Sequence, residues 1–228
     1  MHTKSRRSGG MSRGFGLLVT WAALLGGMTM ASGCPTSKPS SLTVPLQLRT
    51  TQMPNAVVSF AQTPGRVYVA PVQDGRTEKD RIGENRENTP PTPVYGDSSP
   101  TEFVRTAVVE QLKNDGVTIV QSADGADAVL AMTLNRFWAQ ESPNYDAQVI
   151  LAVEVRNRGG AALWSGTTSG HDGTFGRSLS AENYQQVLSN ALANAVSGLV
   201  AKPQFQEALR PQAQPAHAPA RAKKHQKP

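Results

Sequence analysis

Two apolar runs, Ala128–Trp138 and Tyr145–Arg156, constrain the fold most strongly, because apolar and polar residues alternate along each of them. A period of two is typical of a strand with one covered face. Ser142-Pro143-Asn144 lies between them and has the composition of a turn, since proline is excluded from central strands. We therefore predict a long antiparallel hairpin. Its covered face is expected to hold Leu130, Met132, Leu134, Ala147, Val149, Leu151, Val153 and Val155.

Two further segments predict helices that cover this sheet. Ser99-Pro100-Thr101-Glu102 is typical of a helix start with a capping box, and Gly116 is expected to end that helix. The second helix is expected to begin after Ser180 and to end at Pro203. Both segments repeat apolar residues with a helical period. The expected buried stripes are Val104, Ala107, Val108 and Leu112 in the first helix, and Tyr184, Val187, Leu188, Ala191, Leu192, Ala195, Val196 and Leu199 in the second.

Shorter apolar segments predict the remaining strands. Leu42–Leu48 alternates, but Pro45 makes it an edge strand. Arg66–Val72, the first helix and Val117–Val120 form a crossover unit, for which parallel strands are expected. Asp124-Gly125 is expected to be a turn before the central hairpin, and Ala162–Gly170 the last strand.

Three segments are expected to be connections. Gln73–Asp97 reads as a long polar loop of mixed charge, which is either a recognition surface or a solvated excursion. Residues 157–160 read as a tight turn, and His171–Ser178 as a flexible, glycine-rich loop. Together these elements predict a two-layer α+β sandwich over residues 42–209, with a mostly antiparallel sheet and two helices on one face.

The N-terminal segment has the pattern of an exported protein. Basic residues through Arg13 precede an apolar run from Phe15 to Met30, and small residues then lead to Cys34. We predict a lipoprotein signal peptide over residues 1–33, lipidation of Cys34, and a tether over residues 34–41. An ordinary secretory signal with an incidental cysteine is the alternative, although a lone exported cysteine has no disulfide partner within the chain. Translation beginning at Met11 would give a signal of more usual proportions.

The positive charge of the chain lies mainly at its two ends. Of 23 basic residues, four lie in residues 1–33 and five in residues 210–228, and neither segment contains an acidic residue. Residues 34–209 therefore hold 14 basic against 17 acidic residues, a net charge of −3. A nucleic-acid-binding domain carries its basic patch on the fold, so we expect no nucleic-acid partner. Residues 210–228, rich in proline, alanine and lysine, are expected to be a disordered basic tail.

The sequence contains no recognisable catalytic or metal-binding motif. His171 is the only histidine in the predicted domain, and it lies beside Asp172 without a nucleophile in a recognisable elbow. Phosphate-binding glycine loops and Cys/His metal spacings are absent from the sequence. We therefore expect no enzymatic activity, no cofactor and no metal, and a hydrolase that uses His171 is the least favoured hypothesis.

The order of these parts resembles the YajG-like family of bacterial envelope lipoproteins over about residues 34–209. The segments that carry the resemblance are the residues before Cys34, Val69–Gly83 with Asp74, Arg76 and Ile82-Gly83, Phe103–Val120, Ala128–Phe137, Leu163–Gly166 and Asn183–Val200. The chain is also similar to auxiliary lipoproteins of lipid-transport systems and to lipoprotein activators of peptidoglycan synthases. These resemblances imply an envelope protein and supply no catalytic residues.

The function expected from the sequence is therefore binding without catalysis. The chain is expected to be a lipoprotein anchored through Cys34, facing the periplasm from the outer membrane and binding an envelope protein or peptidoglycan. An auxiliary subunit of a lipid-transport complex is the alternative, and it would need an apolar groove between sheet and helices.

Overall fold

The computed structural model describes residues 40–47, 60 and 63–211. The predicted signal peptide, Cys34, Leu48 and residues 212–228 of the predicted tail lie outside these residues. Among the described residues, no helix is both long and apolar enough to cross a bilayer.

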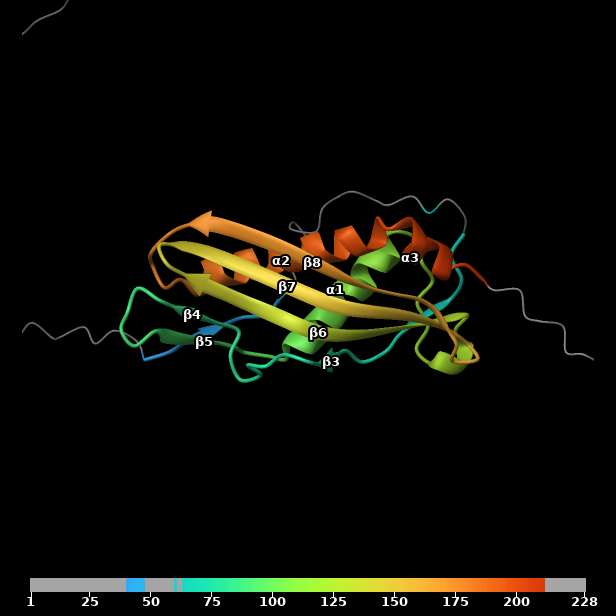
Figure 1. Cartoon of the computed structure of the whole chain (residues 1–228), viewed down its shortest axis with the longest axis horizontal. Helices are drawn as coiled ribbons and strands as arrows, with labels where there is room; N and C mark the ends of the chain where they lie inside the picture. Colours follow the sequence, from blue (N-terminus) through green and yellow to red (C-terminus); the bar gives the residue numbers. More distant parts are fainter. Residues whose placement is uncertain (1–39, 48–59, 61–62, 212–228) are drawn as a thin grey trace, which may run out of the picture. The chain divides into compact units, whose positions relative to one another are not determined.

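Three long antiparallel strands form the centre of the sheet: β6 (Ala128–Glu141), β7 (Asn144–Asn157) and β8 (Ala162–Phe175) (Figure 1). Ser142 and Pro143 connect β6 to β7, as the sequence predicts. The turn before β8 contains Gly160 at a φ of +83°, which glycine adopts without steric cost. All eight residues expected on the covered face of the hairpin are at most 3% exposed. The predicted hairpin is therefore confirmed.

Short strands pair along the other side of β6. β2 (Val67–Val69), β3 (Gln73–Asp74) and β4 (Gly83–Asn85) all run parallel to it. β4 pairs in antiparallel orientation with β5 (Thr92–Gly96), and β5 pairs in parallel with β1 (Leu42–Val44) at the edge of the sheet. The long ladders are thus antiparallel, and four of the short ones are parallel. The edge position predicted for the first strand is confirmed.

The expectation of a long polar loop over Gln73–Asp97 is wrong, because this segment contributes β3, β4 and β5. Buried residues such as Ile82 and Val94 hold this segment on the sheet. They are too far apart in the sequence to show the alternating pattern of a strand. Gly83 also lies directly against the backbone of β6. A Cβ atom at this position would be 2.1 Å from the carbonyl oxygen of Ala139, so only glycine fits.

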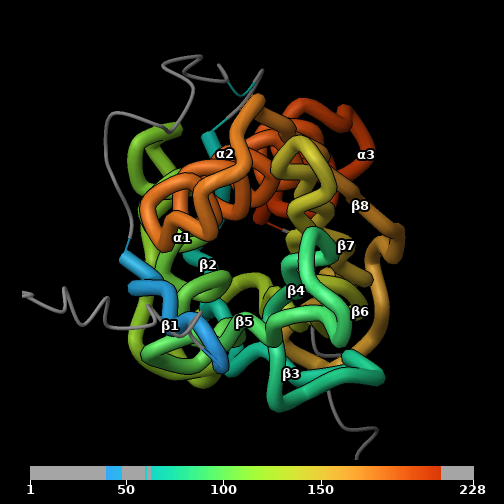
Figure 2. Tube along the Cα trace, turned by 90° about the vertical axis from the view of Figure 1, so that its left-hand side faces the viewer, coloured from blue at the N-terminus to red at the C-terminus, as the bar shows by residue number. Residues whose placement is uncertain are grey.

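Three helices pack on one face of this sheet: α1 (Pro100–Asn114), α2 (Ala181–Val200) and α3 (Pro203–Ala208) (Figure 2). Phe103 of α1 contacts Phe137 of β6 edge to face, and Phe205 of α3 contacts Trp164 of β8 in the same way. All predicted stripe residues of α1 and α2 are buried. The α+β class and the helix-covered face are confirmed, with α3 as an additional short helix that begins at Pro203.

The helices begin and end where the sequence predicts, but the predicted capping box at the start of α1 does not form. Gly116, at a φ of +84°, follows that helix, and the Val117 amide donates to the Leu112 carbonyl, a Schellman ending. The Ser180 hydroxyl accepts a hydrogen bond from the Asn183 amide at the start of α2. The Ser99 hydroxyl, by contrast, contacts the Thr101 hydroxyl at 2.8 Å, so the predicted capping box does not form.

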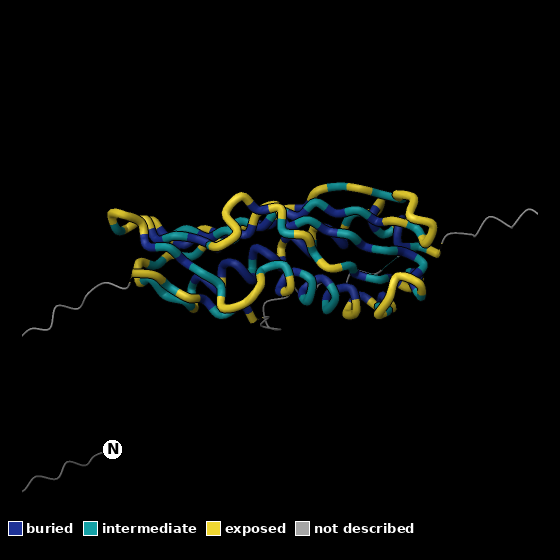
Figure 3. Tube along the Cα trace, turned by 90° about the horizontal axis from the view of Figure 1, so that it is seen from below, coloured by how far each residue is buried: buried dark blue, intermediate teal, exposed yellow. Residues whose placement is uncertain are grey.

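Strand β8 and helix α2 approach each other very closely. A Cβ atom on Gly170 would lie 1.9 Å from the carbonyl oxygen of Ala191. The Thr168 hydroxyl donates to the Ala195 carbonyl at 2.7 Å in the same interface. Two side chains from the helical layer donate to outward-facing carbonyls of β8: Asn194 to His171 at 2.9 Å and Lys202 to Thr167 at 2.8 Å. Figure 3 shows buried segments between the two layers and exposed segments at the turns.

Three further sequence expectations need correction. His171 to Phe175 belong to β8 and do not form a flexible loop. Val117–Val120 does not form a strand and contributes a single parallel bridge between Ile119 and Val67. Asp124 and Gly125 lie in a short 3₁₀ helix, Ala123–Gly125. Each segment is too short or too rich in glycine to show a clear period, so tertiary contacts decide its conformation.

Candidate functional site

The face of β6, β7 and β8 opposite the helices is the candidate binding surface; we call it the outer face. No described helix covers it (Figure 2). Its side chains are half-buried or exposed. Small and polar residues predominate, which suits contact with a partner better than burial in a core. The outer face comprises Val129, Ala131, Thr133, Trp138 and Gln140 of β6, Gln148, Ile150, Ala152 and Glu154 of β7, and Ser165, Thr167, Ser169 and His171 of β8.

The first hollow on the outer face lies beside the segment that joins β2 to β3. It has a volume of about 490 Å³ and is lined by Ala70, Pro71, Thr133, Ala152 and Thr167, among others. The Ala70 amide donates to the Leu130 carbonyl at 3.0 Å, which fixes this segment against β6. The lining combines methyl groups and hydroxyls with the Glu154–Arg156 ion pair and suits an extended ligand segment.

A β-bulge in β6 separates this hollow from a second one. Leu134 pairs with Leu151 and Arg136 with Ile150, so Asn135 is an extra residue in β6. A bulge re-aims the side chains that follow it. Beyond this one, Phe137 is buried beneath the helices and Trp138 lies on the outer face. Because the bulge shifts the alternation by one residue, the period of two in the sequence does not predict this arrangement.

The second hollow has a volume of about 340 Å³ and is lined by charged residues around Trp138. The Arg81 guanidinium lies over the Trp138 ring, 5.7 Å from its centroid, a cation–π contact. Arg81 also forms an ion pair of 2.7 Å with Glu78, and the hydrogen bond between them raises the pKa of Arg81. Arg136 is exposed and has no ion-pair partner among the described residues. This hollow therefore combines an aromatic surface with an available guanidinium.

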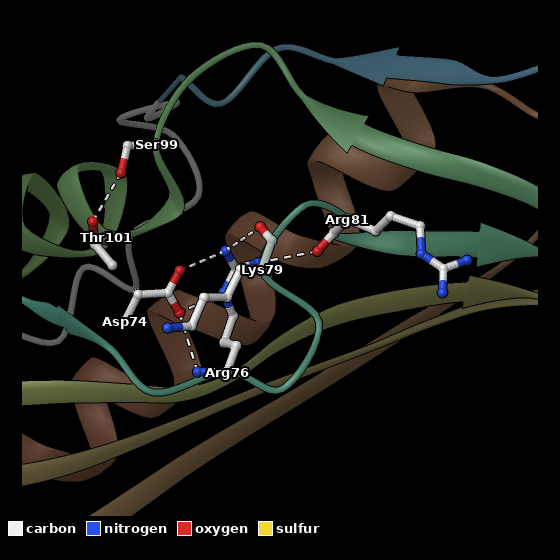
Figure 4. Close-up of polar contacts among 6 residues, drawn as sticks. All are labelled: Asp74, Arg76, Lys79, Arg81, Ser99 and Thr101. Carbon is white, nitrogen blue, oxygen red and sulfur yellow. Dashed lines mark hydrogen bonds and ion pairs between the residues drawn. The ribbon is translucent and has the colours of Figure 1, made fainter.

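An ion pair between a buried arginine and a half-buried aspartate shapes the loop that carries Arg81 (Figure 4). Arg76 donates to both carboxylate oxygens of Asp74, at 2.9 and 2.8 Å, and to the carbonyls of Lys79 and Arg81, at 2.9 and 3.1 Å. The Arg76 side chain is only 4% exposed. Its hydrogen bonds hold the pKa of the Asp74 carboxyl below the ordinary value. This bidentate pair fixes the loop between β3 and β4 and places Arg81 beside β6.

His171 lies in an exposed pair with Asp146. Its Nε2 atom lies 2.8 Å from Oδ2 of Asp146 on the neighbouring strand, and the two side chains are 61% and 50% exposed. Asp172, its neighbour in the sequence, accepts a hydrogen bond from Asn190. Neither of the two outer-face hollows includes His171. Among the described residues, no group of three or more His, Cys, Asp or Glu side chains is arranged to hold a metal ion.

Sequence reasoning identified the charged loop as a possible recognition surface but missed the site that it helps to form. From the sequence, Asp74 is expected to form a solvated pair with the arginines around it, and Trp138 belongs to an apolar run. Cys34, the single predicted site residue, lies outside the described residues. The mixed charge of residues 74–87 was the one sequence signal for the second hollow.

An open mixed sheet with its helices on one face defines the class of fold, and comparisons with known proteins agree with this class. No protein-family model matches the chain, and no curated protein matches it. Protein XCC0632 from Xanthomonas campestris, described as a DUF330 family protein, matches with a TM-score of 0.55 at 15% identity, over 72% of this chain and 96% of that one. This likeness shows a shared fold.

Two other solved structures match with lower scores. Lipoprotein GNA1162 from Neisseria meningitidis has a TM-score of 0.35 at 16% identity, over 49% of this chain and 85% of that one. The hypothetical protein CT253 from Chlamydia trachomatis has a TM-score of 0.43 at 11% identity, over 62% and 96%. Scores in this range carry no argument about function.

Proposed function

We propose that this chain is a lipoprotein of the YajG-like type, anchored in the bacterial outer membrane through an acylated Cys34 and facing the periplasm. It binds another envelope component, a protein or peptidoglycan, and catalyses no reaction. The anchor is supported by the basic start, the apolar run and the small residues that precede the single cysteine. The single observation that carries the binding function is the outer face, which has two hollows and is covered by none of the helices in the described part of the chain.

The packing of the described core favours surface binding over a carrier that encloses a lipid. Leu151, Leu188 and Leu192 have no exposed surface between the sheet and the helices. A lipid-transport subunit with an apolar groove in this layer would need space where these side chains pack. The hollows on the outer face are instead open and partly polar, as expected for contact with a peptide or a glycan.

Replacement of Cys34 tests the anchor. The Cys34→Ala chain is expected to remain in the membrane as uncleaved precursor or to be released in soluble form, because the acyl chains supply the stable attachment. Labelling with radioactive palmitate and separation of inner and outer membranes measure both properties. A Cys34→Ala chain that migrates as mature, membrane-bound protein would contradict the proposal.

Photocrosslinking in intact cells tests the binding surface. A photoreactive amino acid at Thr133 or Gln140 lies on the outer face, and one at Lys113 lies on the exposed side of α1 as the matched control. We expect one envelope protein, or peptidoglycan fragments, to be captured from both outer-face positions and not from Lys113. Capture from Lys113 alone, or from none of the three positions, would rule out the outer face as the binding surface.

A further inference from the structure

Phe175, the last residue of β8, is the one large hydrophobic side chain exposed among the described residues. Its exposed fraction is 83%. The strand register places it beside Asn144, next to the turn between β6 and β7. Contact between water and a phenyl ring is unfavourable, so a partner that covers the ring lowers the free energy.

The turns around Phe175 expose three prolines beside polar and charged side chains. We call this region the hairpin end; it comprises residues 86–91, residues 142–143 and residues 175–177. Pro90, Pro91 and Pro143 are exposed there. Arg177 lies 3.8 Å from Glu87, and Arg86 forms an ion pair of 2.6 Å with Glu84. The hairpin end therefore combines a phenyl ring and three prolines with two guanidinium groups, each of which is paired with a glutamate.

The chain also enters the fold at the hairpin end. Leu42, the first residue of β1, lies in one row across the sheet with Val94, Gly83 and Ala139. Ala139 is two residues before the end of β6, so β1 begins close to the hairpin end. Figure 1 shows the start of β1, the β4–β5 turn and the end of β8 at the same end of the sheet. Ser40 follows Cys34 by six residues, which span at most about 22 Å.

We propose that the hairpin end rests on the lipid surface that holds the anchor, with Phe175 inserted among the headgroups. This inference depends on the proposed acylation of Cys34, because the short connection brings this end of the fold to the membrane. Arg86 and Arg177 then lie near lipid phosphates, where guanidinium groups are attracted. The long strands rise from the membrane, and the outer face is presented toward the periplasm.

A spin label at position 175 tests the depth of this residue. Cys34 is the only cysteine, so Phe175→Cys supplies the one free thiol when Cys34 is acylated. Ala161→Cys, in the exposed turn at the opposite end of β7 and β8, is the matched control. Both full-length chains are processed in cells and reconstituted into vesicles of phosphatidylethanolamine and phosphatidylglycerol. Collision with oxygen, which concentrates in lipid, is compared with collision with an aqueous nickel chelate.

We expect the label at position 175 to favour oxygen over the chelate, and the label at position 161 to favour the chelate. Equal access of the chelate to both positions would overturn the proposal. Exclusion of both reagents at position 175 would also overturn it, because the label would then be buried against another copy of the chain. The chain without an added cysteine is the control for the anchor. If a thiol reagent labels that chain, Cys34 is free and the proposed acylation has failed; if it does not, the result at position 175 bears on the membrane contact alone.

Discussion

The side-chain amide of Asn85 donates a hydrogen bond of 2.6 Å to the carboxylate of Glu141, which has no exposed surface. The other carboxylate oxygen accepts a hydrogen bond of 3.1 Å from the Leu179 amide, just before α2. Leu179 has a φ of +46°, which is unusual for a residue other than glycine. A single buried carboxylate thus joins the ends of β4 and β6 to the segment that precedes α2.

Removal of the Asn85 side chain is expected to destabilise the protein. Asn85→Ala leaves one oxygen of a buried carboxylate without its donor, which costs about 1–3 kcal/mol. Urea unfolding of the purified protein measures this loss. Asn144→Ala, at an exposed position near the same turn, is the control and should change stability little. Equal losses in the two variants would show that the bond to Glu141 has no special importance.

A methyl group at Gly170 is expected to separate α2 from β8. Because its carbon would lie 1.9 Å from the Ala191 carbonyl oxygen, Gly170→Ala forces the backbone to shift at a cost of about 1–3 kcal/mol or more. Gly198→Ala, in α2, is the matched control. Its Cβ atom would lie at an ordinary 3.6 Å from Thr168, and alanine favours a helix by about 0.5–1 kcal/mol. Thermal melts should therefore shift in opposite directions.

The contribution of Asp74 to stability is expected to disappear in acid. Hydrogen bonds from Arg76 lower the pKa of this carboxyl from the ordinary 3.8. A group with a lowered pKa in the folded state stabilises the fold above its unfolded pKa, and this stabilisation is lost as the pH falls through the folded value. The free energy of unfolding should therefore be higher in the wild type than in Asp74→Asn at neutral pH, and the difference should shrink below pH 3.8.

Asp80→Asn, in the same loop but outside the hydrogen bonds of Arg76, is the control for this pH dependence. It should alter the free energy of unfolding little at either pH. A difference between wild type and Asp74→Asn that persists unchanged in acid would show that the Asp74 charge is not the stabilising group.

Substitutions at neighbouring positions of β7 are expected to have very different effects. Val153 is 3% exposed beneath the helices, and Val153→Asp buries an unpaired carboxylate at a cost of several kcal/mol, roughly enough to unfold a marginally stable domain. Glu154 lies on the outer face in an ion pair with Arg156, so Glu154→Gln should be nearly silent. Thermal melts of the two variants check this. Similar destabilisation of both would show that β7 is covered on both faces.

The long elements could be predicted because each one repeats its apolar period many times. Val149 and Leu151 belong to a strand of 14 residues, and Leu188 and Leu192 belong to a helix of 20 residues. A repeat of this length leaves one arrangement that buries all the apolar side chains. The helix-covered face of the sheet follows directly from these two patterns.

The candidate site could not be predicted in the same way, because it depends on contacts between distant segments. β4 has three residues, and its position is decided by the fit of Gly83 against Ala139. The extra residue Asn135 reverses the direction of the side chains after it, which brings Trp138 to the outer face. Arg81 lies over this ring at the end of a loop that Arg76 holds through the Arg81 carbonyl.

Asn194 and Lys202 donate hydrogen bonds to carbonyls of β8, and these bonds restrict the addition of another strand beside β8. β8 is the last strand of the sheet and has 14 residues, a length that invites strand addition by another chain. The carbonyls of Thr167 and His171 are already occupied from within the molecule. A strand added along this edge could not use these two carbonyls unless the Asn194 and Lys202 side chains moved away first.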